Sequence, residues 1–130
     1  MNRLLVTLLL LLVGCGKQES LVTFEFAHGR DKNAPTYRAA TADATLIEKA
    51  RAELAKPPSE RRLHINGTIS AGEANNRPWR WHFNDGEWTL AELSIELCDG
   101  QPSYVNDNLD QWLKEVGSYC PWASYVSREL

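Results

Sequence analysis

The sequence lacks the short motifs that indicate most kinds of enzyme. It has no glycine-rich phosphate loop, no nucleophile elbow around a serine, no pair of histidines at helical spacing and no cysteine beside a catalytic-type histidine. These absences favour a binding or interaction module over a catalyst. We accordingly expect no cofactor.

Long hydrophobic runs, internal repeats and biased tracts are also scarce. The 130 residues are 43% hydrophobic and 24% charged, a balance that excludes a disordered, collagen-like or coiled-coil chain. One apolar run stands out, over residues 4–13, but it is too short to cross about 30 Å of hydrocarbon as a helix. The sequence therefore predicts a single domain built around one core.

The apolar run belongs to a segment that resembles a bacterial lipoprotein signal peptide. A basic start, Met1-Asn2-Arg3, precedes the run, and Leu12-Val13-Gly14-Cys15 follows it in the manner of a lipobox. The resemblance implies removal of residues 1–14 and a diacylated Cys15, hence a lipid anchor in the cell envelope. Gly16 stands where a retention signal would have Asp, which implies the outer membrane, facing the periplasm. The alternative is a plain secretory signal followed by a coincidental cysteine.

The linker and the charge limit the partners. Residues 15–20 lead into the expected domain, residues 21–130, and the five residues after Cys15 reach at most about 18 Å. The domain should therefore lie close to the membrane. Loss of Arg3 leaves 13 basic against 17 acidic residues, a net charge of −4, which disfavours a nucleic acid partner.

Alternating polar and apolar residues predict strands over 21–26, 36–40, 63–69, 79–83, 88–98 and 123–130. Helical spacing predicts helices over 44–55, with Asp43 as N-cap, and about 103–113. We expect a turn at Asn84-Asp85-Gly86 and a bulge near Ala91, which would place Leu93, Ile95 and Leu97 on one strand face. The predicted fold is α+β: an antiparallel sheet of four to six strands packed against two helices.

Cys98 and Cys120 are the two thiols that remain once Cys15 is lipidated. An even pair in an oxidising compartment predicts a disulfide between them. Free buried thiols and metal ligation are the alternatives.

A small polar site is expected from His64 and His82, which fall on the polar phase of two neighbouring strands, with Arg80 and Glu96 nearby. Two imidazoles and a carboxylate suit zinc or acid–base chemistry. The alternative is that each histidine is simply hydrogen-bonded at the sheet surface. The five tryptophans, all within residues 79–122, could form a platform for a carbohydrate or peptide, but Trp79 and Trp81 share the phase of Phe83 and favour the core.

Four segments together resemble the N-terminal domain of the seventy-four-kilodalton calmodulin-binding protein. They are residues 62–69, 79–83, 95–105 and 120–124, within a resemblance that covers about residues 22–130. Calmodulin itself is not an expected partner of an envelope lipoprotein. The helix over 44–55 also lacks a bulky aromatic anchor and mixes Glu48 and Glu53 with Lys49 and Arg51.

The expected function is a membrane-anchored envelope lipoprotein that acts as a non-enzymatic binding module for a protein or glycan. The alternative is a small metal-dependent or hydrolytic periplasmic enzyme that uses His64, His82 and Glu96.

Overall fold

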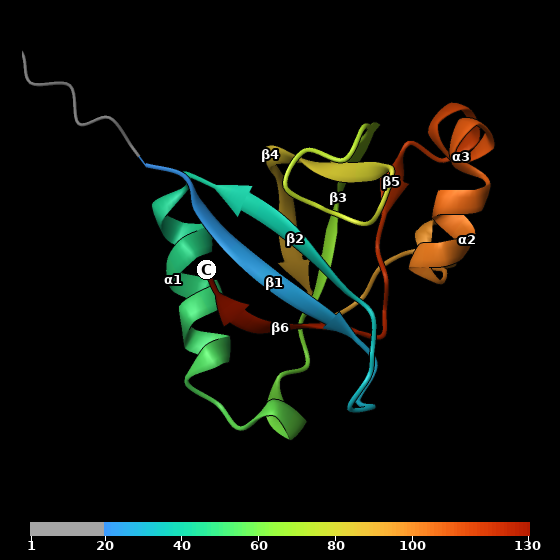
Figure 1. Ribbon diagram of the computed structural model, residues 1–130. Helices are drawn as coiled ribbons and strands as arrows, with labels where there is room; N and C mark the ends of the chain where they lie inside the picture. The colour runs from blue at the N-terminus through green and yellow to red at the C-terminus, as the bar shows by residue number, and fades with distance from the viewer. Residues whose placement is uncertain (1–19) are drawn as a thin grey trace, which may run out of the picture.

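The computed structural model describes residues 20–130, so Cys15 and the expected cleavage site lie outside the described residues. The domain is α+β, as predicted, but its strands form two three-stranded antiparallel sheets (Figure 1). The first sheet has the order β2-β1-β6 and the second the order β4-β3-β5. None of the helices within this range has the length and apolar character needed to cross a membrane.

The strands are β1 (Val22–His28), β2 (Thr36–Thr41), β3 (His64–Ala71), β4 (Trp81–Ala91), β5 (Ser118–Tyr119) and β6 (Ser124–Glu129). The helices are α1 (Ala44–Leu54), α2 (Pro102–Asp107) and α3 (Leu109–Glu115), with 3-10 turns η1 (Pro58–Glu60) and η2 (Glu96–Cys98).

An aromatic core fills the space between the two sheets. Phe26 of β1 meets the ring of Trp88 edge-on at 5.6 Å between centroids, and Tyr37 of β2 lies 5.7 Å from Trp81 of β4. These four side chains are at most 3% exposed. The prediction that Trp81 belongs to the core is confirmed, whereas Trp79 is only partly buried and packs against it.

Asn76 joins the two sheets. Its side-chain oxygen accepts a hydrogen bond from the Arg38 backbone in β2 at 2.7 Å, and its amide nitrogen donates to the Trp81 carbonyl in β4 at 2.8 Å. The residue is 1% exposed, so these two bonds satisfy backbone groups that water does not reach.

Helix α1 forms where the sequence predicts it. The Asp43 carboxylate accepts a hydrogen bond from the Leu46 backbone at 3.0 Å, which caps the first turn. At the other end, the Arg61 guanidinium donates to the backbone carbonyls of Glu53 and Leu54, at 3.1 Å each. A cation placed there also offsets the negative end of the helix dipole.

The predicted turn at Asn84-Asp85-Gly86 is wrong, because β4 continues through it as a wide bulge. The β3 register steps from Gly67↔Trp88 to Ile69↔Phe83, so residues 84–87 of β4 bulge out of the ladder. The strand resumes because Trp88 and Leu90 both return to the core, each 3% exposed.

The predicted strand over 88–98 is also too long, and the bulge expected near Ala91 is not there. Strand β3 begins at His64, which pairs with Ala91, so β4 has no β3 backbone to pair with beyond this point. Leu93, Ile95 and Leu97 consequently lie outside any sheet.

The helix predicted over about 103–113 is two helices. They meet at Asn108, whose backbone has a φ of −123° and whose side-chain amide donates to the Tyr104 carbonyl at 2.9 Å. Side-chain bonds of this kind compete with the helical pattern. The two-residue strand β5 was not predicted, because so short a strand leaves no periodic signal.

Candidate functional site

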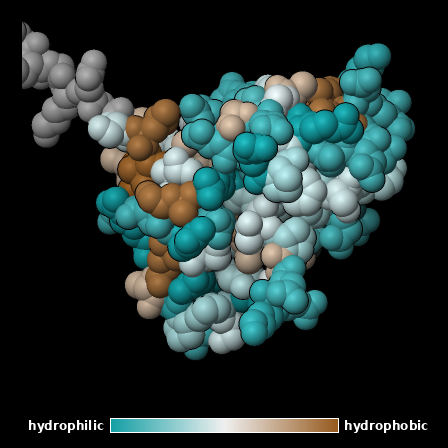
Figure 2. Space-filling view, viewed as in Figure 1, coloured by the Kyte–Doolittle hydropathy of each residue, from teal (hydrophilic) through white to brown (hydrophobic). Residues whose placement is uncertain are grey.

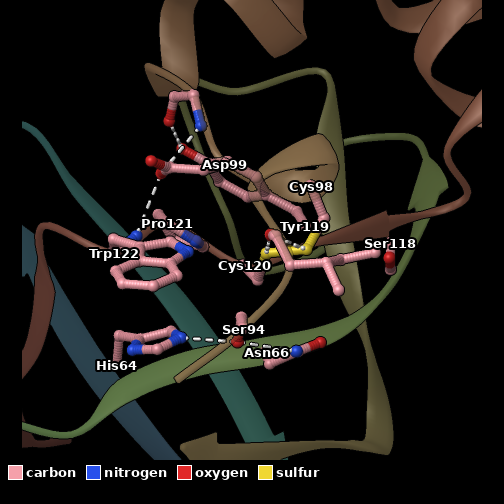
Figure 3. The surroundings of a disulfide bond; sticks show 12 residues. His64, Asn66, Ser94, Cys98, Asp99, Ser118, Tyr119, Cys120, Pro121 and Trp122 are labelled. Carbon is pink, nitrogen blue, oxygen red and sulfur yellow. Dashed lines mark hydrogen bonds between the residues drawn. A yellow bond between two sulfur atoms is a disulfide. The ribbon is translucent and has the colours of Figure 1, made fainter. Parts of the chain in front are cut away.

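The segment after β4 and the segment before β6 are joined by the predicted disulfide, which the structure confirms. The Cα atoms of Cys98 and Cys120 are 5.1 Å apart, and the Cys120 backbone also donates to the Cys98 carbonyl at 2.8 Å. Both residues are buried. We call the surroundings of this bond, residues 92–101 and 118–123, the disulfide corner (Figure 3).

Asp99 holds the two halves of the corner together. One carboxylate oxygen accepts from the Gly100 backbone at 2.9 Å and from the Trp122 backbone at 3.0 Å. Figure 3 shows the Trp122 indole lying over His64, with ring centroids 5.6 Å apart and planes 12° from parallel. Because one face is stacked, Trp122 is held in one orientation although it is 42% exposed.

His64 begins β3 and leads to a second polar group. Its Nε2 lies 2.6 Å from the Ser94 hydroxyl, which also accepts from the Asn66 side chain at 3.0 Å. Burial lowers the pKa of His64, while the negative charge of Asp99 acts in the opposite direction. The imidazole is therefore neutral at neutral pH and is able to accept the Ser94 hydroxyl proton as a hydrogen bond.

The surface of the corner is strongly apolar. Leu93, Ile95 and Leu97 are 77%, 68% and 66% exposed. Leu97 borders a groove of about 170 Å³ that α2 and α3 complete with Tyr104, which is 55% exposed, and with Trp112. We call Leu93, Ile95, Leu97, Tyr104 and Trp122 the apolar rim.

Acidic residues lie among these side chains. Glu92 and Glu96 alternate with the exposed leucines and isoleucine along the chain, and Glu115 lines the same groove as Leu97. Asp99 is exposed at the centre of the corner. The apolar rim therefore lies in a negative local field.

The structure does not gather the four residues expected to form one polar site. In the β3–β4 register His64 lies opposite Ala91 and His82 opposite Ser70, which places the histidines six residues apart along β3, about 20 Å. The prediction of a joint His64, His82 and Glu96 site is therefore wrong. The loop before β4 is longer than a tight hairpin, so residues 64 and 82 lie toward opposite ends of the ladder.

Each of these residues has its own local role. The His82 ring bonds the Gly72 carbonyl at 2.8 Å, and the Arg80 guanidinium donates to the Asn106 carbonyl of α2 at 2.9 Å. Glu96 opens η2 within the disulfide corner, as an exposed residue. Among residues 20–130, no group of three or more His, Cys, Asp or Glu side chains is arranged to hold a metal ion.

Sequence reasoning missed Ser94 and Asp99, and it counted Trp122 only among the other tryptophans. The available signal was adjacency: Asp99-Gly100 follows one half-cystine and Pro121-Trp122 follows the other. A disulfide between the two cysteines brings these flanking residues together.

The disulfide corner also contains two of the four segments on which the family resemblance depends, residues 95–105 and 120–124. Comparison with curated proteins and with solved structures found no match. Comparison with family models found one that spans almost the whole described domain, residues 20–130. The chain belongs to the family of the N-terminal domain of the seventy-four-kilodalton calmodulin-binding protein.

Proposed function

We propose that this chain is a lipid-anchored lipoprotein of the cell envelope, in the outer membrane facing the periplasm, and that its domain binds a protein partner through the apolar rim. The observation that carries the proposal is the exposure of three large aliphatic side chains, 66–77% each, within five residues of a segment outside both sheets. Single exposed apolar residues are ordinary on protein surfaces, but contiguous ones mark interaction sites.

The rigidity of the corner supports a role in recognition. The Cys98–Cys120 bond and the two hydrogen bonds to Asp99 fix the segment that presents the rim. A binding surface that is already ordered loses less conformational entropy on association, so more of the contact energy contributes to affinity.

The chemistry of the rim favours a protein over a glycan. Glycan sites present flat aromatic rings beside polar side chains, whereas three of the five rim residues are aliphatic. Because acidic residues surround the rim, we expect the partner to offer apolar side chains framed by basic ones.

Photo-crosslinking in intact cells tests this proposal. A photoreactive amino acid at Ile95 or Leu97 of the full chain should give the same discrete protein adduct, and the matched probe at Glu48, exposed on α1, should not. The adduct from position 97 should disappear when Leu93→Asp is added. Equal adducts from positions 95, 97 and 48, or none from any of them, would overturn the proposal.

A second candidate function, a hydrolase, follows from the Ser94–His64 contact. A neutral imidazole 2.6 Å from a serine hydroxyl is the pairing that activates a nucleophile. It replaces the His64, His82 and Glu96 set as the basis for an enzyme. A fluorophosphonate probe should then label Ser94 in the wild-type protein and fail to label the His64→Ala variant. No labelling of Ser94 in the folded wild-type protein would reject the hydrolase.

A further inference from the structure

A second apolar surface lies where the chain enters the domain. Leu21, just before β1, is 55% exposed, and Leu130, just after β6, is 48% exposed. The Leu130 backbone donates to the Thr23 carbonyl at 2.9 Å, so the two leucines lie at the same end of the first sheet. Figure 2 shows apolar surface gathered over the start of β1 and over α1.

The register places both leucines on the outer face of the first sheet. Phe24 is opposite Glu129, which puts Leu130 opposite Thr23, and side chains directly opposite share a face. Leu21 shares that face because it is two residues from Thr23. Farther along the same face, Glu25 pairs with Arg128 at 3.0 Å and with Arg38 at 3.8 Å. The face is thus apolar at the entry end and charged beyond it.

The short linker determines what can cover this edge. Five residues separate Cys15 from Leu21, and they span at most about 18 Å when fully extended. If Cys15 is lipidated, Leu21 cannot move farther than this from the bilayer surface. An apolar edge held so close to a membrane meets lipid at a high effective concentration.

We propose that the edge formed by Leu21 and Leu130 rests in the headgroup region of the bilayer and orients the domain; this inference depends on the proposed lipid anchor. Leucine side chains are suited to the boundary between headgroups and acyl chains. Arg128, whose side chain is 60% exposed, lies next along the face, where lipid phosphates would meet it.

The orientation has a consequence for the apolar rim. Strand β1 runs from the edge to His28, and the next residue, Gly29, donates to the Ala123 carbonyl at 2.9 Å, beside Trp122. Seven residues of strand separate the two ends, about 23 Å. Figure 1 shows β1 running from the chain entry to the end of the sheet where β6 begins. The rim is therefore held away from the bilayer and faces soluble partners.

Depth-dependent quenching in vesicles tests the orientation. The full lipidated protein is placed in vesicles of phosphatidylethanolamine and phosphatidylglycerol that carry doxyl-labelled lipid, with a fluorophore on Leu130→Cys. The matched control carries it on Asn33→Cys, in the exposed β1–β2 loop at the far end. We expect quenching at position 130 to be at least threefold stronger than at position 33. Adding Leu21→Glu should reduce it to the control value.

The outcomes separate this inference from the proposed function. Protein that does not sediment with the vesicles would overturn the anchor and, with it, the orientation. Protein that sediments but is quenched equally at positions 130 and 33, or is unaffected by Leu21→Glu, would overturn the orientation alone. Leu21 is exposed and precedes β1, so we expect the substitution to leave the fold intact, which circular dichroism checks.

Discussion

Replacement of Cys98 and Cys120 by alanine should lower the free energy of unfolding by about 3 kcal/mol. The disulfide joins residues 22 positions apart, and closing a loop of this length removes about that much conformational entropy from the unfolded chain. In a domain of this size the loss corresponds to a fall in Tm of roughly 10–15 °C. The backbone bond between the two residues, 2.8 Å long, is retained in the variant and does not contribute to the difference.

Urea denaturation followed by tryptophan fluorescence measures this effect, with and without a reducing agent. The reduced wild-type protein and the double variant should be destabilised alike, with the same dependence on urea as the oxidised protein to within about a tenth. The double variant should not respond to the reductant. A loss below about 1 kcal/mol would refute the argument that the disulfide restrains the unfolded chain. So would a double variant that the reductant weakens further.

Three further predictions concern the core and the histidines. Asn76→Ala should cost about 2 kcal/mol or more in chemical denaturation, because it leaves two buried backbone groups without partners; a loss within about 0.5 kcal/mol, the range of ordinary surface substitutions, would contradict this. Gly67→Ala should cost about 1–3 kcal/mol, since the added Cβ would lie 2.5 Å from the Trp88 Cβ, and an unchanged urea midpoint would show that the strands part freely. Burial lowers the pKa of His28 and of His64 below 6.5, so the unfolded chain takes up protons first and stability present above about pH 6.5 falls as the pH drops through the folded-state values. The His28→Asn/His64→Asn variant should lose less stability than the wild-type protein between about pH 7.5 and 5, and equal losses would refute this account.

Local signals made part of the fold predictable. Helix α1 has a capping aspartate, Asp43, and apolar residues at helical spacing, and both act within a few residues of one another. Strands β1 and β3 alternate clearly because each has one face on the core. The disulfide also followed from counting cysteines alone.

The errors arose where the outcome depends on distant partners. Leu93, Ile95 and Leu97 alternate like strand residues, yet β3 ends its pairing at His64 and offers them no ladder. Asn84-Asp85-Gly86 has turn composition, but the return of Trp88 to the core keeps the chain in the strand. Alternation shows which side chains share a face, and only the tertiary structure decides whether that face is covered.

The candidate site was predictable only in part for the same reason. Cys98 and Cys120 were identified as a pair, and His64 as a polar residue of interest. Its partners, Ser94 at 2.6 Å and Trp122 at 5.6 Å, come from positions 30 and 58 residues further along the chain. No short-range pattern connects residues at such separations.

The place of β1 between β2 and β6 sets the order in which the molecule can assemble. Ser127 donates to the Glu25 carbonyl across 102 positions, and Arg128 bonds the Glu25 carboxylate across 103. The first sheet therefore stays open on one side until almost all of the described chain is available, and contacts this distant in sequence make folding slow. A chain that is threaded through a membrane would remain extended for the whole passage, because its central strand finds its second neighbour only after the last segment has crossed.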